Sequence, residues 1–498
     1  LDVISAVSGG SYIMSWLFLQ PFYYHKFVDR DASIETIQDL MFDPGGLFQK
    51  HLAQSVRILS SPNVGVFAAR AAIIGIIGAA MGAIRLISSD RRASLALARN
   101  AASPARKFYA QSIQLSYHGL PVSAPRARLS NRPRHIKNLK PASFYDSQHG
   151  LDMVDIDPVS FPELQSFLEE HGLPCCIFGT TAHLGGSFER MEITPAGISS
   201  ASLGQRQWKE LSEFYPLPGQ STHNLKPWKT EFKRAPDPYW LLRNTNLAPI
   251  ISGAALSEET ESSECMGRSA SKKHSRKKIG ANIAKFFNVG LDFAIPDPRG
   301  GGHSILVSDG GHSENLGLQA LIRRGCRRIV VVDAEHDSDY GFSSLAKLAA
   351  RASAPDGYEL RAPGESVAWN PKRFHPDEPV FILDAIDLKS GARISRITYV
   401  KLSLGDTVRD AMPESVRTYE RLSKTSKRRR ARRRLLGTFP QESTTDQYFE
   451  PQQFLAYRDL GRTIWEKAPR GVKDLSITPS ERAAHGRGPD ARQASTTG

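Results

Sequence analysis

The chain has 498 residues, 40% of them hydrophobic, and a net charge of +14 from 65 Lys and Arg against 51 Asp and Glu. This length and apolar content allow a substantial core and suit a large α/β enzyme with insertions. The four cysteines have neither the pattern of a disulfide framework nor the spacing of a zinc site, so we expect a reducing compartment, or a protein with no need of bridges.

The first predicted element is a short apolar strand that stops at Ser8. Residues 1–12 read LDVISAVSGGSY, an apolar run that ends at a serine among small residues. A strand that breaks sharply into a helix lifts such a hydroxyl out of the backbone, and it needs small residues two positions before and after, here Ala6 and Gly10. Ser8 is therefore a candidate nucleophile that precedes a helix starting at Gly9. The alternative is an ordinary serine in a glycine-rich turn.

An apolar segment at residues 64–87 follows, within a long insertion predicted over 23–140. Its uncharged part, residues 71–84, is shorter than the ~20 residues that span a bilayer, although an arginine at each end could reach the interface. Gly78 and Gly82 have the four-residue spacing that lets membrane helices approach closely. Two interpretations stay open: a membrane-associated helix, or a buried helix of a soluble fold.

The second chemical motif lies at residues 303–337. Ile305 to Val307 is a predicted strand, and Asp309-Gly310-Gly311 is a turn that places a carboxylate at the carboxyl end of that strand. Catalytic groups of open α/β sheets collect at such ends, and a serine needs a base to become nucleophilic. Asp309 is therefore the candidate base for Ser8.

The elements around this motif complete an α/β pattern. The turn leads into an apolar helical stripe and then into residues 329–332, an unbroken β-branched run typical of a strand buried on both faces of a parallel sheet. Further strands are predicted at 174–181, 188–193, 380–383 and 397–402.

The two motifs together resemble the patatin-like phospholipases, which are lipid acyl hydrolases that use a Ser–Asp dyad without histidine. The resemblance rests on AVSGGS at 6–11 and SDGGHSENLGL at 308–318, and weaker similarity extends through 251–257, 288–291 and 438–461. It implies an α/β fold in which helices flank a mostly parallel central sheet, over residues 1–468.

The resemblance also implies roles for individual residues. Ser8 would attack the ester carbonyl, Asp309 would accept its proton and return one to the departing alcohol, and water would hydrolyse the acyl-enzyme. The backbone N–H of Gly9 would donate to the oxyanion. The positions that support the two turns are Ala6, Gly10, Gly310 and Gly311. No cofactor or metal is expected.

The chain departs from the family pattern at two points. The family's pentad begins with glycine where this chain has Ala6, a change small enough for the turn to form. The family's glycine-rich oxyanion loop precedes the nucleophile strand, whereas this chain begins at Leu1. We expect an amino-terminally truncated form, and losing oxyanion donors would lower turnover by at least about 10²- to 10³-fold.

Other polar residues near the second motif have weaker interpretations. His336 could complete the Ser, Asp, His order of an α/β-hydrolase triad, but an Asp-Gly-Gly turn that runs straight into a helix favours the dyad. His303 and His312 are expected to flank the turn. Asp333 and Asp337 are interpreted as strand-end and loop carboxylates rather than as metal ligands.

Positive charge concentrates in two runs, at 258–278 and 424–436, which are predicted to be exposed loops. Such runs attract lipid headgroups or nucleic-acid phosphates, or they are solvated linkers. No aromatic residue interleaves the arginines as base stacking would require, so we expect a membrane surface as partner, with the protein facing the cytoplasm, rather than nucleic acid. Residues 469–498 are polar and predicted to be disordered.

The sequence therefore predicts a serine lipid acyl hydrolase that cleaves glycerophospholipid or related acyl esters at a membrane surface. Two alternatives belong to other classes. One is a catalytically inactive, membrane-associated scaffold that keeps the fold, and the other is a polyanion-binding protein that uses the basic runs.

Overall fold

The structure, a computed structural model, describes eleven stretches of the chain. They are residues 1–55, 120–122, 152–154, 161–184, 187–201, 204–207, 293–296, 304–351, 357–425, 437–442 and 451–473. Several predicted segments lie outside these residues: the apolar segment 64–87, the basic loop 258–278, nearly all of the basic loop 424–436, and the tail beyond residue 473.

The chain divides into two compact units. The first comprises Leu1–Gly317 with Thr444–Leu455, and the second comprises Leu318–Ser443 with Ala456–Gly498. The domain predicted over residues 1–468 thus contains parts of both units. Each unit has its own sheet and its own helices.

The first unit contains a seven-stranded sheet in the order β7-β6-β5-β4-β9-β8, with β1 also paired to β4. Its strands are β1 (Val3–Val7), β4 (Cys175–Leu184), β5 (Ser187–Thr194), β6 (Gly197–Ser200), β7 (Gly204–Gln207), β8 (Phe293–Pro296) and β9 (Ser304–Asp309). A separate two-stranded sheet pairs β2 (Leu120–Val122) with β3 (Asp152–Val154).

The prediction of a mostly parallel central sheet is wrong for these strands. β1 runs parallel to β4, but β4–β5, β5–β6, β6–β7, β4–β9 and β8–β9 are all antiparallel. Short connections explain much of this pattern, since the two residues between Thr194 and Gly197 can join only antiparallel neighbours. The fold is mixed α/β, with an antiparallel majority in this sheet.

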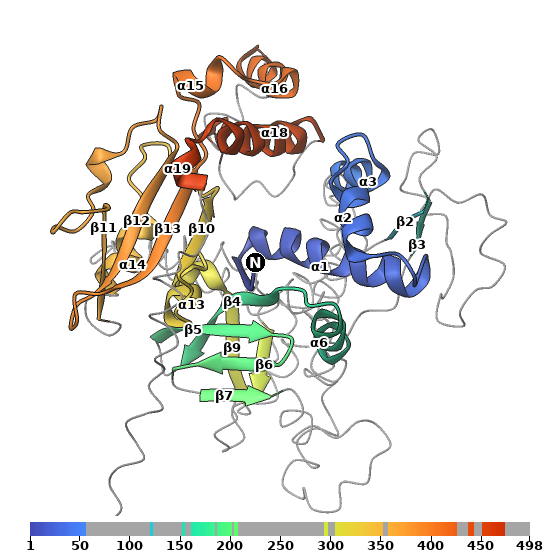
Figure 1. The fold of residues 1–498 in the computed structure, drawn as a ribbon, viewed down its shortest axis with the longest axis horizontal. Helices are drawn as coiled ribbons and strands as arrows, with labels where there is room; N and C mark the ends of the chain where they lie inside the picture. Colours follow the sequence, from blue (N-terminus) through green and yellow to red (C-terminus); the bar gives the residue numbers. More distant parts are fainter. Residues whose placement is uncertain are drawn as a thin grey trace, which may run out of the picture. The chain divides into compact units, whose positions relative to one another are not determined.

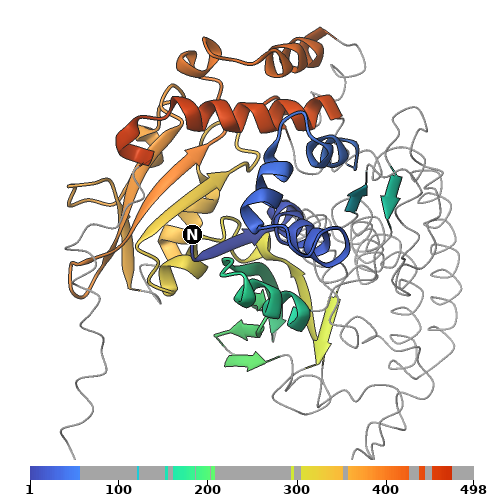
Figure 2. The same ribbon diagram turned by 45° about the vertical axis from the view of Figure 1, so that its right-hand side comes forward.

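β1 and β9 share one edge of β4, because β5 pairs along the other edge. β1 ends with Val7 opposite Gly179, and β9 ends with Asp309 opposite Thr180, the next residue of β4. The two strands run in opposite directions along β4, so their carboxyl ends meet there. Figure 2 shows β1, in dark blue, leading directly into the first helix.

Four described α-helices lie entirely within this unit: α1 (Gly9–Phe27), α2 (Ile34–Phe42), α3 (Leu47–Ser55) and α6 (Phe161–Glu170). Ser33 begins α2 as its N-cap, because its hydroxyl accepts a hydrogen bond from the Thr36 N–H at 3.2 Å. Leu19, Ile37 and Leu164, from three of the helices, are fully buried in one core with side chains of β4. Burying each such side chain contributes about 1.5–3 kcal/mol.

The second unit contains a four-stranded sheet in the order β10-β13-β12-β11. The four strands of this sheet are β10 (Arg328–Asp333), β11 (Tyr358–Arg361), β12 (Val380–Asp387) and β13 (Arg393–Lys401). The second unit also contains α13 (Leu318–Arg323), α14 (Ser343–Arg351), α15 (Asp406–Arg409), α16 (Glu414–Thr425), β14 (Gly437–Thr438), β15 (Gln441–Glu442), most of α18 (Pro451–Lys467) and α19 (Arg470–Lys473). α16 lies alongside α18 (Figure 1), and Val416, Leu460 and Ala456 are fully buried in the core that these helices share.

β10 confirms one prediction and corrects another. It pairs in parallel with β13, as the β-branched run at 329–332 predicted. The predicted burial on both faces is wrong, because Ile329 and Val331 are buried whereas Val332 is 69% exposed. β10 stands at the end of the strand order, and its side chains alternate between a buried and an open face.

Two findings bear on the predicted tail and membrane segment. α19 lies within the segment predicted to be disordered, and the Thr398 hydroxyl of β13 donates to the Val472 carbonyl at 3.0 Å, so order continues to Lys473. Among the stretches that the structure describes, no helix combines the length and the hydropathy needed to cross a bilayer.

Candidate active site

Ser8 occupies the junction between β1 and α1. Its backbone has φ 51° and ψ −130°, a conformation that non-glycine residues rarely adopt and that costs about 1–3 kcal/mol. The sharp turn brings its neighbours together, and a Cβ on Gly10 would lie 3.6 Å from the Cβ of Ala6. This distance is an ordinary van der Waals contact, so the turn places the two positions side by side.

Asp309 ends β9 and begins the 3-10 turn η5 (Gly310–His312) as its N-cap. The residue is completely buried, and each carboxylate oxygen has a partner. Oδ1 accepts the Gly311 N–H at 2.8 Å, and Oδ2 accepts the Ser8 Oγ at 2.8 Å. The structure thus brings Ser8 and Asp309, 301 residues apart in sequence, into direct hydrogen-bond contact.

Gly310 permits this approach. A Cβ at this position would lie 2.3 Å from the Gly179 carbonyl oxygen and 2.8 Å from Val7 Cγ1, so only glycine fits there. The turn after β9 therefore packs directly on the place where β1 ends against β4. That packing carries the Asp309 carboxylate to Ser8.

Gly9 is the first residue of α1 and is exposed. The first N–H groups of a helix have no acceptor within the helix, and the helix dipole adds partial positive charge at this end. α1 has no side-chain cap at Ser8. The predicted oxyanion donor is thus a helix N-terminal N–H on the residue next to the Ser8 hydroxyl.

Thr181 is a residue of the site that carries no functional signal in the sequence. This buried residue of β4 donates its hydroxyl to the Asp309 carbonyl oxygen at 2.7 Å. A threonine in an apolar strand gives no sign of such a role, because the contact arises only when β9 pairs with β4.

Three histidines were considered from the sequence. His312 is buried within η5, next to the Asp309 turn, as expected. His303 lies outside the described residues. His336 belongs to the second unit, where a Cβ on Gly437 would lie 3.0 Å from its Nε2.

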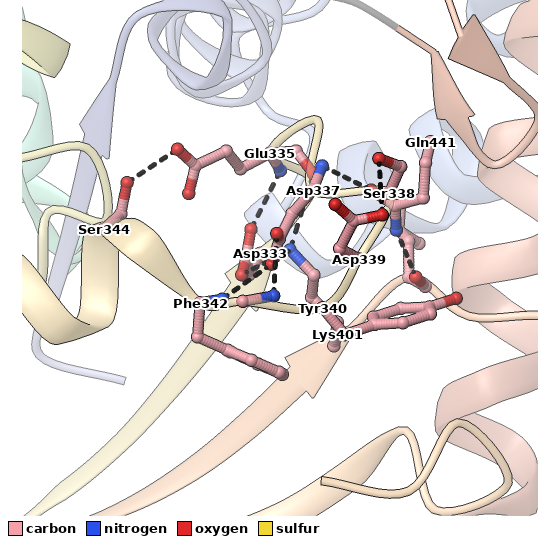
Figure 3. Close-up of polar contacts among 12 residues, drawn as sticks. Asp333, Glu335, Asp337, Ser338, Asp339, Tyr340, Phe342, Ser344, Lys401 and Gln441 are labelled. Carbon is pink, nitrogen blue, oxygen red and sulfur yellow. Dashed lines mark hydrogen bonds and ion pairs between the residues drawn. The ribbon is translucent and has the colours of Figure 1, made fainter. Parts of the chain in front are cut away.

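Asp333 and Asp337 also belong to the second unit, where they surround a buried lysine (Figure 3). Lys401 Nζ lies 2.9 Å from Asp333 Oδ2 and 3.5 Å from Asp337 Oδ2, and its side chain is 0% exposed. The Asp337 carboxylate also accepts the Gly341 and Phe342 N–H groups, both at 2.9 Å. Asp333 ends a strand and Asp337 lies in a loop, as predicted; their ion pairs with Lys401 and the loop-capping contacts of Asp337 are additions from the structure.

Tyr399 closes this cluster by donating its hydroxyl to Asp333 Oδ2 at 2.6 Å. Burial, followed by the negative charge of Asp333, raises the pKa of Tyr399 well above its usual value of 10. The tyrosine therefore stays a protonated donor. Within the portions of the chain that the structure describes, no group of three or more His, Cys, Asp or Glu is placed to hold a metal ion.

Comparison with known proteins finds similarity only among solved structures. No family model matches the chain, and no curated protein matches it in sequence. Among solved structures, the chain is similar to human GIVD cytosolic phospholipase A2, with 11% identity, a TM-score of 0.43, and coverage of 94% of this chain and 60% of that chain. The same protein in complex with methyl gamma-linolenyl fluorophosphonate gives 11% identity, a TM-score of 0.38, and coverage of 95% and 60%. The chain thus spans three fifths of these proteins, and a likeness with such TM-scores carries no functional argument.

Proposed function

We propose that the chain is a serine acyl-ester hydrolase of patatin-like type, with Ser8 as nucleophile and Asp309 as general base. The observation that carries this proposal is the 2.8 Å hydrogen bond from Ser8 Oγ to Asp309 Oδ2. It joins a buried carboxylate to a hydroxyl on a strained backbone, and such strain clusters at functional sites. An ordinary serine in a glycine-rich turn would need neither feature.

The chemistry follows from these positions. The Gly311 N–H holds Oδ1 of Asp309, so Oδ2 is the oxygen that takes the Ser8 proton as Oγ attacks the ester carbonyl. Asp309 then returns a proton to the departing alcohol. The Gly9 N–H donates to the negative oxygen that develops on the former carbonyl, and water releases the acyl group from Ser8 in the second half-reaction.

The proposed substrates are glycerophospholipids or related acyl esters, met at a membrane surface that faces the cytoplasm. Support for this class comes from the resemblance of the segments 6–11 and 308–318 to those of patatin-like phospholipases. The dyad itself is compatible with any accessible acyl ester. Ester chemistry and lipid preference are therefore tested separately.

The test compares hydrolysis of a short-chain p-nitrophenyl ester by the chain, by Ser8→Ala and by Ser15→Ala. Ser15 is a matched control, since it is a buried serine of α1 whose hydroxyl donates to the Tyr12 carbonyl at 2.7 Å. We expect Ser8→Ala to lose the activity and Ser15→Ala to keep it. Equal rates for the chain and Ser8→Ala would refute the proposal.

Phospholipid vesicles test the substrate class. We expect fatty acid release from phosphatidylcholine vesicles by the chain and none by Ser8→Ala. If the chain hydrolyses the soluble ester but releases no fatty acid from vesicles, the proposal of an ester hydrolase stands and the proposal of a phospholipid substrate is rejected.

A further inference from the structure

Two buried hydroxyls contact backbone carbonyls in the turn that begins at Asp309. Thr181, on β4, donates to the Asp309 carbonyl at 2.7 Å. Ser313, at the end of η5, lies 3.1 Å from the Gly310 carbonyl, to which it donates. The two hydroxyl oxygens are 2.8 Å apart. Both hydroxyl residues are buried. The Gly310 carbonyl also accepts the backbone N–H groups of Ser313 and Glu314, at 3.0 and 2.8 Å.

The available protons define how this cluster works. Thr181 has one proton, and its shortest contact with a carbonyl is to Asp309 rather than to Gly310, which is 3.4 Å away. The Thr181 hydroxyl is also placed to donate to the Ser313 oxygen at 2.8 Å, and Ser313 donates its own proton to the Gly310 carbonyl. The Asp309 carbonyl is therefore tied to β4 through Thr181, while Ser313 braces the following peptide.

The turn needs this external support because of its own composition. Gly310 and Gly311 permit the close approach to β4, but glycine restricts the backbone less than any other residue. The Gly311 N–H, which holds Asp309 Oδ1, shares its peptide plane with the Gly310 carbonyl that Ser313 contacts. The peptide before it carries the Asp309 carbonyl that Thr181 holds, so the two hydroxyls contact two consecutive peptides of the turn. A rotated peptide would move the Gly311 N–H and turn Oδ2 away from Ser8.

We propose that Thr181, braced by Ser313, is a positioning residue that holds the Asp309 carboxylate in line with the Ser8 hydroxyl. This role rests on the proposed hydrolase function and adds to it a residue that touches neither substrate nor the reacting atoms. β4 then contributes twice to the site. Its backbone pairs with both β1 and β9 and brings their ends together, and its Thr181 hydroxyl orients Asp309 at the end of β9.

The neighbouring residue of β4 provides a matched control. Thr180 is also fully buried, and its hydroxyl donates to the Met191 carbonyl of β5 at 3.1 Å. Adjacent residues of a strand point to opposite faces of the sheet. Thr180→Val and Thr181→Val therefore each remove a hydroxyl from the same strand, and each removes one donor to a carbonyl. Only the carbonyl affected by Thr181→Val belongs to Asp309.

The experiment measures kcat and KM for p-nitrophenyl ester hydrolysis, per folded molecule, for the chain and three variants. We expect Thr181→Val to lower kcat about 10- to 100-fold with little change in KM, as for a catalytic group displaced by a fraction of an ångström to an ångström. Thr181→Ser, which keeps the hydroxyl, should recover most of kcat. Thr180→Val should keep it. Equal kcat values for Thr180→Val and Thr181→Val, or no recovery in Thr181→Ser, would overturn the positioning role.

A second readout separates this inference from the proposed function. The titration of the Asp309 carboxyl, followed by ¹³C NMR, should shift in Thr181→Val and stay unchanged in Thr180→Val, whether or not the ester is cleaved. An unchanged titration in Thr181→Val would reject the positioning role even in an active enzyme. If the chain is inactive but the Asp309 titration still responds to Thr181→Val, the positioning role of Thr181 stands and the proposed hydrolase function is rejected.

Discussion

Asp309 and Asp333 make an instructive pair, because each ends a strand and each is buried, with 0% and 2% exposure. Asp333, in the second unit, meets Lys401 and the Tyr399 hydroxyl, so its charge is neutralised in a closed network. Asp309, in the first unit, meets the hydroxyl of Ser8, which is partly exposed and sits on a strained backbone. The partner, rather than burial or the position at a strand end, distinguishes the candidate catalytic carboxylate from the structural one.

The largest effect should come from Asp309→Asn. Asparagine keeps the size and an oxygen acceptor for the Gly311 N–H, but it cannot take the Ser8 proton, so kcat should fall about 10²- to 10⁴-fold. Asp333→Asn should leave turnover per folded molecule unchanged. Steady-state kinetics on a short-chain ester measure both. Full turnover in Asp309→Asn, or a comparable loss in Asp333→Asn, would remove the distinction between the two carboxylates.

Lys401→Met should destabilise the protein by about 3–5 kcal/mol. The substitution fills similar space but leaves the buried carboxylate of Asp333 without its cation. The free energy of unfolding in urea measures the effect, and Lys347→Met, at an exposed lysine of α14, is the control. A loss no larger than that of the control would mean that the lysine does not stabilise the network.

Gly310→Ala should cost about 1–3 kcal/mol and also reduce turnover. The added Cβ would collide with the Gly179 carbonyl, so the turn that carries Asp309 must move away from Ser8. Gly461→Ala is the control, because nothing lies within 4 Å of a Cβ at that position in α18, and alanine there should stabilise the helix. Urea unfolding and ester hydrolysis together test this prediction. Wild-type turnover in Gly310→Ala would contradict the close approach at this turn.

The smallest effect concerns pH and Tyr399. The pKa of Tyr399 is raised in the folded protein, so the tyrosine favours the folded state fully below pH 10, where unfolded tyrosine is still protonated. As pH rises above about 10, the unfolded chain loses this proton and the folded protein keeps it, so stability falls until the folded pKa is passed. Tyr399→Phe should reduce this fall by up to about 1.4 kcal/mol per pH unit. Urea unfolding between pH 8 and 11 gives the slopes, and identical slopes would contradict the prediction.

Much of the local structure could be predicted from the sequence. The strand before Ser8, the helix after it, the strand that ends at Asp309, and the strands at β4, β5, β12 and β13 all correspond to apolar runs with turn residues beside them. These features depend on neighbouring residues and therefore leave a local pattern. The pairing of Ser8 with Asp309 is predicted because both follow the carboxyl ends of predicted strands, and the resemblance of the two motifs supports it.

The features that were missed depend on partners distant in the sequence. The apolar run of β9 reads the same whether its neighbour is parallel or antiparallel, so the direction of pairing could not be predicted from it. Val332 belongs to a β-branched run, yet it is exposed because side chains alternate between the two faces of the sheet along β10 and only one face is covered at this position. The burial of Lys401 and the contact of Thr181 with Asp309 depend on which strands lie beside them.

Reaction with a fluorophosphonate, followed by peptide mass mapping, tests the central claim most directly. Such a reagent forms a stable adduct only with an activated serine hydroxyl. The Ser8–Asp309 pair predicts a single adduct on the peptide that contains Ser8, which is lost in Ser8→Ala and forms far more slowly in Asp309→Asn. Absence of an adduct on Ser8 in the folded chain, or equal labelling of the chain and Asp309→Asn, would contradict it.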